Sequence, residues 1–331
     1  MTALIAHLAY VEILTPDLES STAFFREIVG MDVVDRDAGS AYLRTWGEHL
    51  RYNLILTSAP ASGLGHVAWR TTSAEALDLA ADRLAHDGSG LGWREPAGAI
   101  GRSYRFRGPA GQQQALFWDA EFYLAPPHLA SPFPSRPQRS TARGVAARYL
   151  DHVNYPSGDI LGDAQWYERT LGIELTEWTE VPGANLAIFA TLSAQTGFEL
   201  ALLRDDSGIP GRFHHLAFMV DERADVVRAA ELFREAGVPI EWGPGRHGHG
   251  ESMSVYVREP GGMRVEIVSA SLCRRPWGAA PVKWSPADGS ADFYLSNPLP
   301  EAFLEVLPAV DDSTTARIDV GGSGNPWGEK A

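Results

Sequence analysis

Residues 9–34 have the sequence AYVEILTPDLESSTAFFREIVGMDVV, and residues 151–176 repeat its pattern as DHVNYPSGDILGDAQWYERTLGIELT. Each stretch begins with the alternation of a β-strand, passes through a turn rich in Pro, Asp or Gly, and continues into a helix with aromatic residues on one face. Each predicted helix ends at a glycine, Gly30 or Gly172, a common residue just after the last turn of a helix. The match indicates an internal duplication.

A second pair of segments extends the duplication. Residues 65–88, GHVAWRTTSAEALDLAADRLAHDG, match residues 214–237, HHLAFMVDERADVVRAAELFREAG, and each predicts a strand, an amphipathic helix and a closing glycine. Two strand-like runs around a tight turn follow in both halves. The order strand, helix and three strands thus occurs four times. We predict an α+β protein whose four βαβββ units pair into two barrel-like domains, with a cavity for a small molecule between curved sheets that face each other.

The length of 331 residues is sufficient for two ordinary domains. The predicted divisions of the chain are an N-terminal domain (1–124), a linker rich in Pro, Ser and Arg (125–148), a C-terminal domain (149–270) and a tail (271–331). The tail carries Trp277, Trp284 and Tyr294 among prolines and glycines. We expect it to wrap over a surface as a lid or an interface.

Composition excludes several classes of function. The chain has 28 Lys and Arg against 42 Asp and Glu, a net charge of -14, which would repel nucleic acid and anionic membranes. The single cysteine, Cys273, rules out a disulfide framework and fits a reducing compartment. The first twenty residues lack the basic start and the apolar run of a secretory signal. We therefore expect a soluble cytoplasmic protein.

Polar residues interrupt two apolar strands in the second half. In LDHVNY, residues 150–155, strand alternation places His152 and Asn154 on one face. In HHLAF, His214 and His215 must point to opposite faces, so one of them points inward. The repeat selects His215, and His214 is expected to face outward or to support a neighbour.

The repeat also shows which half can bind a metal. Superimposing the halves by sequence pairs His215 with His66, His152 with Tyr10 and Glu266 with Leu116. Two imidazoles and one carboxylate form a facial ligand set typical of non-haem Fe(II) oxygenases, and Mn(II) suits the same donors. Burying the carboxylate of Glu266 between apolar neighbours would be costly without a cation. A bland alternative is a chance scatter of the ten histidines. If the three residues do bind metal, His66 is expected to be a relic of the duplication or a hydrogen-bonded core residue.

The sequence resembles the type I extradiol, or ring-cleaving, catechol dioxygenases of the vicinal oxygen chelate superfamily, which have a glyoxalase-like fold. The resemblance covers nearly all of residues 5–300. It is closest to the homoprotocatechuate and catechol 2,3-dioxygenase branch. The similar motifs are AYVEI, AYLRTW and LRYNLIL in the first half, and LDHVNY, GRFHHLAF, GPGRHG and REPGGMRVEI in the second.

The resemblance implies a role for each matching residue. His152, His215 and Glu266 stand where the family binds Fe(II), and Asn154 stands where it has an amide beside the substrate. His247, in GPGRHG, and Tyr256, in SVYV, match residues that contact the bound catechol. In such enzymes the metal holds a catechol and O2 together and the ring opens next to the diol. The implied partners are thus a small catechol and O2, and family members commonly form homodimers or homotetramers.

One position departs from the family pattern. The family uses a pocket histidine as acid and base during oxygen activation, and the aligned residue here is Phe198, which cannot carry a proton. His247 and His249 are candidates to take over, with Glu199 a more distant one. Relatives that act on carboxylated catechols carry an arginine where this chain has Trp242. Since an apolar wall would desolvate a carboxylate, we predict a neutral or bulky catechol bound against Phe198, Trp242 and His249.

Two other functions fit the same residues. A metal-dependent isomerase, lyase or epoxide-opening enzyme of the superfamily would need no oxygen-activating histidine. A non-catalytic protein that sequesters a ligand would use the same cavity, although such proteins usually lack the metal ligands. Oxygen uptake with a catechol separates these alternatives from the dioxygenase.

Overall fold

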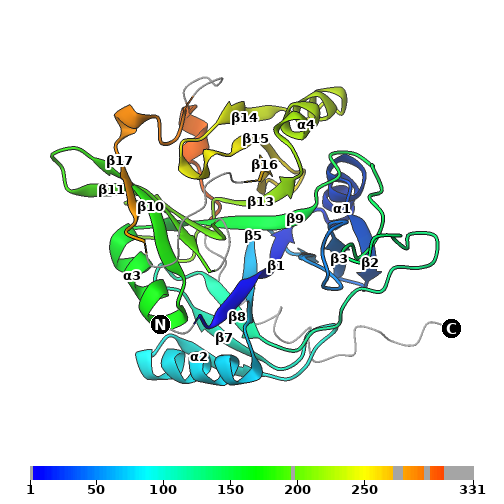
Figure 1. The fold of residues 1–331 in the computed structure, drawn as a ribbon, viewed down its shortest axis with the longest axis horizontal. Helices are drawn as coiled ribbons and strands as arrows, with labels where there is room; N and C mark the ends of the chain where they lie inside the picture. Colours follow the sequence, from blue (N-terminus) through cyan, green and yellow to red (C-terminus); the bar gives the residue numbers. More distant parts are fainter. Residues whose placement is uncertain (1–2, 195–197, 271–278, 294–298, 309–331) are drawn as a thin grey trace.

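The computed structural model describes residues 3–194, 198–270, 279–293 and 299–308, and its four repeated units confirm the predicted order of strand, helix and three strands (Figure 1). The first half contains β1 (Ile5–Thr15), α1 (Leu18–Ala23), the π-helix η1 (Phe24–Val29), β2 (Asp32–Arg36), β3 (Ser40–Arg44), β4 (Leu54–Ser58), β5 (Gly63–Thr71), α2 (Ala74–Asp87), β6 (Gly90–Arg94), β7 (Ser103–Arg107) and β8 (Gln113–Phe117). The second half contains β9 (Tyr149–Ser157), α3 (Ile160–Leu171), β10 (Glu174–Val181), β11 (Leu186–Ser193), β12 (Leu200–Arg204), β13 (His215–Val220), α4 (Arg223–Glu235), β14 (Ile240–Arg246), β15 (Met253–Arg258) and β16 (Arg264–Ser269).

Each half forms one mixed sheet. The strand orders are β2-β3-β4-β1-β5-β8-β7-β6 and β14-β15-β16-β13-β9-β12-β11-β10-β17, where β17 (Val282–Trp284) comes from the tail. The two units of a half meet at a central antiparallel pair, β1 with β5 or β9 with β13, and each central strand has a parallel partner on its other side. The units are therefore joined edge to edge, a feature the repeat pattern did not indicate.

Three helices begin at capping side chains. Asp17, Ser73 and Asp159 precede α1, α2 and α3, and their side chains accept backbone N–H groups of the first turn. The first helix extends to Gly30 as predicted, but its last part is the π-helix η1, which buries Phe24 and Phe25. It ends at Gly30, whose positive φ of 89° and close approach to the backbone of Arg143 favour glycine.

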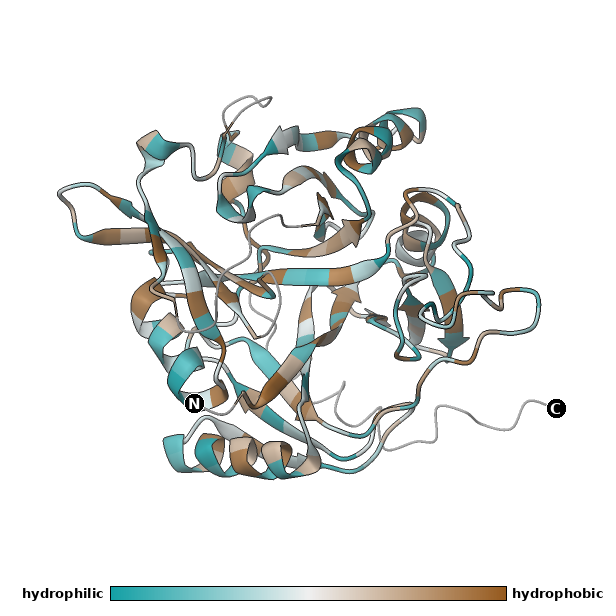
Figure 2. Cartoon of the chain, viewed as in Figure 1, coloured by the Kyte–Doolittle hydropathy of each residue, from teal (hydrophilic) through white to brown (hydrophobic). Residues whose placement is uncertain are grey.

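The two halves pack through their helices and share one core. Phe24 stacks on Phe233 of α4 with ring centroids 6.5 Å apart, so the first helix meets the last. Trp166 of α3 donates a hydrogen bond from Nε1 to Asp87 at the end of α2, at 2.7 Å. Figure 2 shows that β1 is apolar along most of its length, in agreement with its burial. Contacts between helices of different halves thus join the two halves at two places.

Residues 118–148 connect the sheets without forming a named helix or strand. Gln138 accepts a hydrogen bond from Arg44 at 2.7 Å, and Arg143 forms an ion pair with Asp32 at 2.9 Å, so the connection is fastened to the first half. In the described ranges no helix is long and apolar enough to cross a membrane.

Part of the tail joins the second sheet. Strand β17 pairs in parallel with β10, with Trp284 opposite Thr179. A later segment contains the 3₁₀ helix η4 (Glu301–Leu304), and Leu307 beyond it pairs with Phe213 just before β13. Trp277 and Tyr294 lie outside the described residues.

Candidate metal centre

Three adjacent strands bring the predicted ligands onto one face. His152 lies on β9, His215 begins β13, and Glu266 lies in the middle of β16. Ala217 on β13 is the register partner of His152 on one side and of Glu266 on the other. Because side chains repeat every second residue, His215 shares the face of Ala217. The small Ala217 side chain leaves room for the three longer ones to converge.

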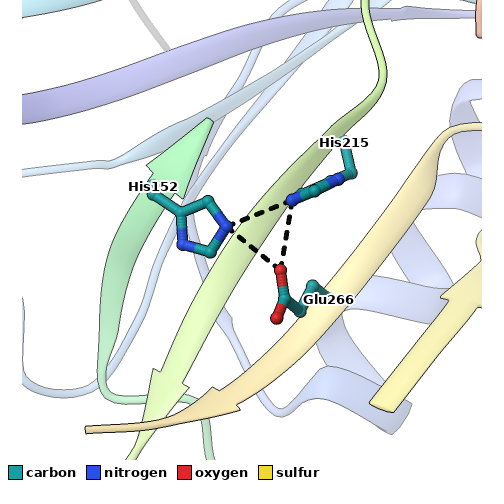
Figure 3. A group of neighbouring side chains, drawn as sticks. All are labelled: His152, His215 and Glu266. Carbon is teal, nitrogen blue, oxygen red and sulfur yellow. Dashed lines mark hydrogen bonds and ion pairs between the residues drawn. The ribbon is translucent and has the colours of Figure 1, made fainter. Parts of the chain in front are cut away.

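The three side chains point at a common position (Figure 3). Nε2 of His152 and Nε2 of His215 are 3.1 Å apart, and each is 3.1 Å from Oε2 of Glu266. Neighbouring donors on one face of an octahedron, each roughly 2.2 Å from an ion, are about 3.1 Å apart. All three residues are buried. The spacing of the donor atoms fits a single divalent ion.

The buried negative charge of Glu266 also indicates that a cation binds at this position. Burial raises the pKa of its carboxyl, but the two neighbouring imidazoles, His152 and His215, outweigh burial and hold that pKa well below its usual range. The group is therefore an anion in the core. Among the described residues no ordinary hydrogen bond reaches Oε2, which meets the two imidazole nitrogens instead. A buried carboxylate in this state is stabilised by a bound metal ion.

Each imidazole has a partner on its other nitrogen. Nδ1 of His152 lies 2.8 Å from Oδ2 of Asp151, which can only accept, so Nδ1 carries the ring proton and Nε2 is free to bind metal. Nδ1 of His215 lies 2.6 Å from Nδ1 of His214, which is buried and does not face outward. Burial, together with the charges of His215 and Arg264, lowers the pKa of His214 far below its usual range, so it is neutral.

The first half has no equivalent set among the described residues. The sheet registers pair Ala68 with Ala115 where Ala217 pairs with Glu266, so Ala115, and not Leu116, is the counterpart of Glu266. The sequence comparison was wrong by one residue, a slip that reverses the face of a strand.

His66 is a hydrogen-bonded core residue, one of the two possibilities predicted for it. Its Nδ1 lies 2.7 Å from Glu12, and its Nε2 lies 3.0 Å from the hydroxyl of Tyr10.

Aromatic residues form one wall beside the three ligands. Tyr256 on β15 is the register partner of Glu266 on β16. Its hydroxyl lies 3.1 Å from Nε2 of His247, and the ring of His247 stacks on Trp242 at 4.7 Å and 8°. Phe303 of the tail contacts Tyr256 with ring centroids 4.8 Å apart. Tyr256, Trp242 and Phe303 thus form a small apolar cluster with a polar edge.

Phe198 and Asn154 lie on the other side of the ligands. The ring of Phe198 is 4.6 Å from that of His152. Asn154 is the register partner of His215, it is buried, and its Oδ1 has no hydrogen-bond partner in the described part of the chain.

His249 belongs to a neighbouring cluster. Its Nε2 lies 2.7 Å from the Thr179 hydroxyl, and its ring contacts Phe189 at 4.7 Å and Trp284 at 5.6 Å. Burial, and then the charge of His247, lowers the pKa of His249 to about 3, so it is neutral near pH 7.

Sequence reasoning missed the residues that orient the ligands. Asp151 directly precedes His152, but no sequence pattern identified it as the hydrogen-bond partner of that ligand. Ala217 could have been found only from the register of three strands. The contact of His214 with the carbonyl of Phe303 had no local signal, because it joins residues 89 positions apart.

Comparison with known proteins agrees with this geometry. The family model of the Glyoxalase/Bleomycin resistance protein/Dioxygenase superfamily matches residues 5–113 and 149–267. The chain is 32% identical over 304 residues to a metapyrocatechase of Geobacillus stearothermophilus, covering 90% of this chain and 92% of the relative. It is 33% identical to a manganese-dependent 2,3-dihydroxybiphenyl 1,2-dioxygenase of Geobacillus genomosp. 3, covering 86% and 91%.

Solved structures show the same fold. Homoprotocatechuate 2,3-dioxygenase from Arthrobacter globiformis superimposes with a TM-score of 0.82 at 24% identity, covering 94% of each chain. The 2,3-dioxygenase LapB from Pseudomonas sp. KL28 gives a TM-score of 0.76 at 22% identity and covers 87% of this chain.

Proposed function

The chain belongs to the glyoxalase/bleomycin resistance protein/dioxygenase superfamily, and we propose that it opens the aromatic ring of a catechol next to the diol, using O2. It is an extradiol ring-cleaving oxidoreductase, like the metapyrocatechases and the dihydroxybiphenyl dioxygenase that it matches over most of its length. The observation that carries the proposal is the buried set of two imidazoles and one carboxylate with donor atoms 3.1 Å apart.

The cofactor is a divalent ion, Fe(II), with Mn(II) as the alternative that one relative uses. His152, His215 and Glu266 would hold it, and the ion would bind the catechol and O2 and pass electrons between them. With only three protein donors, these residues would leave the ion open to both ligands. The buried apolar surroundings exclude water and fix the ligand side chains in place.

Tyr256 and His247 orient the substrate in this proposal. The Ala291 carbonyl can only accept, so Nδ1 of His247 carries the ring proton and Nε2 accepts from the Tyr256 hydroxyl. We assign Tyr256 to hydrogen-bond the catechol oxygen, and Nε2 of His247 to receive a proton one hydrogen bond farther on. Asn154 contributes an amide oxygen that has no hydrogen-bond partner among the described residues, on the other side of the ligands.

The proton path cannot include Phe198, because a phenyl ring cannot carry a proton. Ring cleavage proceeds with a rearranged path that uses His247 and, through its neighbouring cluster, His249. Support comes from the hydrogen bond between His247 and Tyr256, whereas the low pKa of His249, about 3, makes it the weaker base of the two. Glu199 is less suited because its carboxylate accepts a hydrogen bond from the backbone N–H of Ala194 at 2.8 Å.

The substrate is a neutral or bulky catechol. Phe198 and Trp242 provide apolar rings on two sides of the ligands, where a carboxylate would lose its hydration. Arg264, buried near this wall, is paired with Glu241 at 2.6 Å, so its charge is already balanced. Saturation by 3,4-dihydroxyphenylacetate at micromolar concentration would contradict this substrate class, whereas catechol and 2,3-dihydroxybiphenyl are expected to have the higher kcat/KM.

The deciding experiment measures oxygen uptake by metal-loaded protein. With Fe(II) and catechol under air, we expect a yellow ring-fission product and one O2 consumed per catechol. Turnover that does not require O2 would point instead to an isomerase or lyase of the superfamily. Binding of catechol without turnover would indicate a sequestering protein.

The domain division, the oligomeric state and the cellular location complete the proposal. Division into domains at residues 1–124 and 149–270, with a tail after 270 that covers part of the site, is supported by the two sheets and by Phe303. A cytoplasmic homo-oligomer is supported by the single cysteine and by apolar side chains exposed along the connection, namely Phe122, Leu124 and Phe133. Light scattering of the purified protein would test the oligomer.

A further inference from the structure

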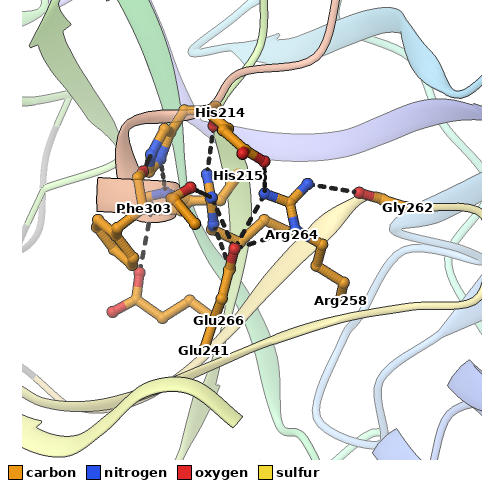
Figure 4. Close-up of polar contacts among 10 residues, drawn as sticks. His214, His215, Glu241, Arg258, Gly262, Arg264, Glu266 and Phe303 are labelled. Atoms are coloured by element: carbon orange, nitrogen blue, oxygen red, sulfur yellow. Dashed lines mark hydrogen bonds and ion pairs between the residues drawn. The ribbon is translucent and has the colours of Figure 1, made fainter. Parts of the chain in front are cut away.

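His214 lies in a chain of contacts that ends at a metal ligand (Figure 4). Nε2 of His214 lies 2.7 Å from the backbone carbonyl oxygen of Phe303, and Nδ1 of His214 lies 2.6 Å from Nδ1 of His215. Nε2 of His215 then faces Glu266 and His152. The chain therefore runs from the tail backbone, through two imidazoles, to the position of the ion.

The Phe303 carbonyl determines the direction of each hydrogen bond in this chain of contacts. A carbonyl oxygen can only accept, so Nε2 of His214 carries a hydrogen. A neutral imidazole has one N–H, which leaves Nδ1 of His214 as an acceptor. Nδ1 of His215 must then donate, and its Nε2 keeps a free lone pair, which is the form that binds metal.

We infer that His214 is a positioning residue, which holds His215 in the metal-binding tautomer and takes its own tautomer from the Phe303 carbonyl. The inference deepens the proposed function, because it concerns how the metal site is prepared. His152 is oriented by the carboxylate of Asp151, whereas His215 is oriented by a neutral imidazole and a backbone carbonyl. The two ligands therefore differ in how strongly each is polarised toward the ion.

The carbonyl of Phe303 is itself held in place. Arg264 donates from Nη2 to the carbonyl of Ala302 at 3.0 Å and from Nη1 to that of Glu305 at 2.8 Å, on both sides of Phe303. Arg264 lies on β16, two residues before Glu266, and its Nε is 2.6 Å from Glu241. The strand that supplies the carboxylate ligand thus also fastens the segment that orients His215.

The direct test is the tautomer of His215 in the metal-free wild-type protein. In protein labelled with ¹⁵N at histidine and treated with a chelator, we expect the proton of His215 on Nδ1 and none on Nε2. A proton on Nε2 of His215 would overturn the inference, and this measurement needs no variant.

The second test compares variants by their affinity for Mn(II). His214→Gln keeps a hydrogen-bond acceptor for His215 and a donor for the Phe303 carbonyl, because an amide offers both. His214→Phe removes both. We expect the Kd for Mn(II) to rise about 10- to 100-fold in His214→Phe and to stay within about threefold of wild type in His214→Gln. The matched control is His66→Phe, which removes a buried histidine with two hydrogen bonds from the other half and should leave the Kd unchanged.

The outcomes separate this inference from the proposed function. An unchanged Kd in His214→Phe, or equal losses in His214→Phe and His214→Gln, would overturn the inference while leaving the metal site in place. Failure of the wild-type protein to bind Mn(II) or Fe(II) would overturn both. Rescue by glutamine is a result that a merely space-filling role of His214 would not produce.

Discussion

The ring of Phe198 packs against the ring of His152, with 4.6 Å between their centroids. An apolar group thus occupies the side of the metal site where an acid or base would be useful. We predict that Phe198→His raises kcat for catechol by about tenfold or more, since a placed general acid–base group contributes roughly 10²- to 10⁴-fold. Steady-state kinetics with equal metal content would check this, and Phe198→Leu is the control, with kcat within a few-fold of wild type. A kcat for Phe198→His no higher than that of Phe198→Leu would contradict the prediction.

Removal of the carboxylate ligand should abolish metal binding. Glu266→Gln keeps the shape of the side chain but removes the buried negative charge, so we expect the affinity for Mn(II) to fall by more than about 100-fold. Metal analysis after gel filtration measures the remaining ion. Glu12→Gln is the matched control, because Glu12 is an equally buried carboxylate beside a histidine in the first half. Loss of metal in Glu12→Gln as well would show that the ion is not held by the second half alone.

The rearranged proton path makes a separate prediction. In the double variant His247→Ala and His249→Ala, we expect kcat to fall by about 10²- to 10⁴-fold, because neither histidine of the proposed proton path remains. Metal content should stay at the wild-type value. The control is His86→Ala, which changes an exposed histidine at the end of α2. Steady catechol turnover by the double variant would rule the path out.

Acid should destabilise the protein through His249. Its pKa is about 3 in the folded chain and roughly 6.5 when unfolded, so the unfolded state binds the extra proton between these values. The contribution of neutral His249 to the free energy of unfolding is fully present above pH 6.5. It is lost as the pH falls, by about 2 kcal/mol between pH 7 and pH 5. Urea unfolding with a chelator at both pH values measures this change. His249→Gln should reduce the difference in unfolding free energy by about that amount, and an unaltered difference would show that the site is hydrated or already charged.

The contact between the halves should contribute strongly to stability. Phe233 is fully buried and stacks on Phe24 across the two halves, so Phe233→Ala leaves a cavity and should cost about 3–5 kcal/mol. Val227→Ala on the same helix is the control, because Val227 is 43% exposed and should change stability by less than about 0.5 kcal/mol. Thermal unfolding of both variants would check the difference, and a loss below about 1 kcal/mol in Phe233→Ala would indicate that the halves do not depend on this contact.

Much of the fold could be predicted because each half contains the βαβββ unit twice. The aromatic helices ending at Gly30 and Gly172, and the alternation in LDHVNY, report local geometry that sequence periodicity captures. The three ligand residues could be placed together because each lies on a strand with a repeat counterpart. Register across strands was less accessible, since a slip of one residue exchanged Ala115 for Leu116.

Other features depend on contacts between distant parts of the chain. The π-helix η1 arises where Phe24 and Phe25 fit against the second half, which local propensity does not describe. The position of His249 in a cluster with Thr179 and Trp284 depends on the tail strand β17. Such arrangements are set by tertiary packing and are not visible in a window of sequence.

The carbonyl of Phe303 comes late in the order of synthesis. A ribosome completes all three ligand strands well before it adds residue 303, so a nascent chain would display its ligands before His214 has received its hydrogen-bond acceptor. Metal captured at that stage would meet a His215 free to adopt either tautomer. Correct metal loading is therefore expected only once the segment that carries Phe303 has been synthesised and has docked.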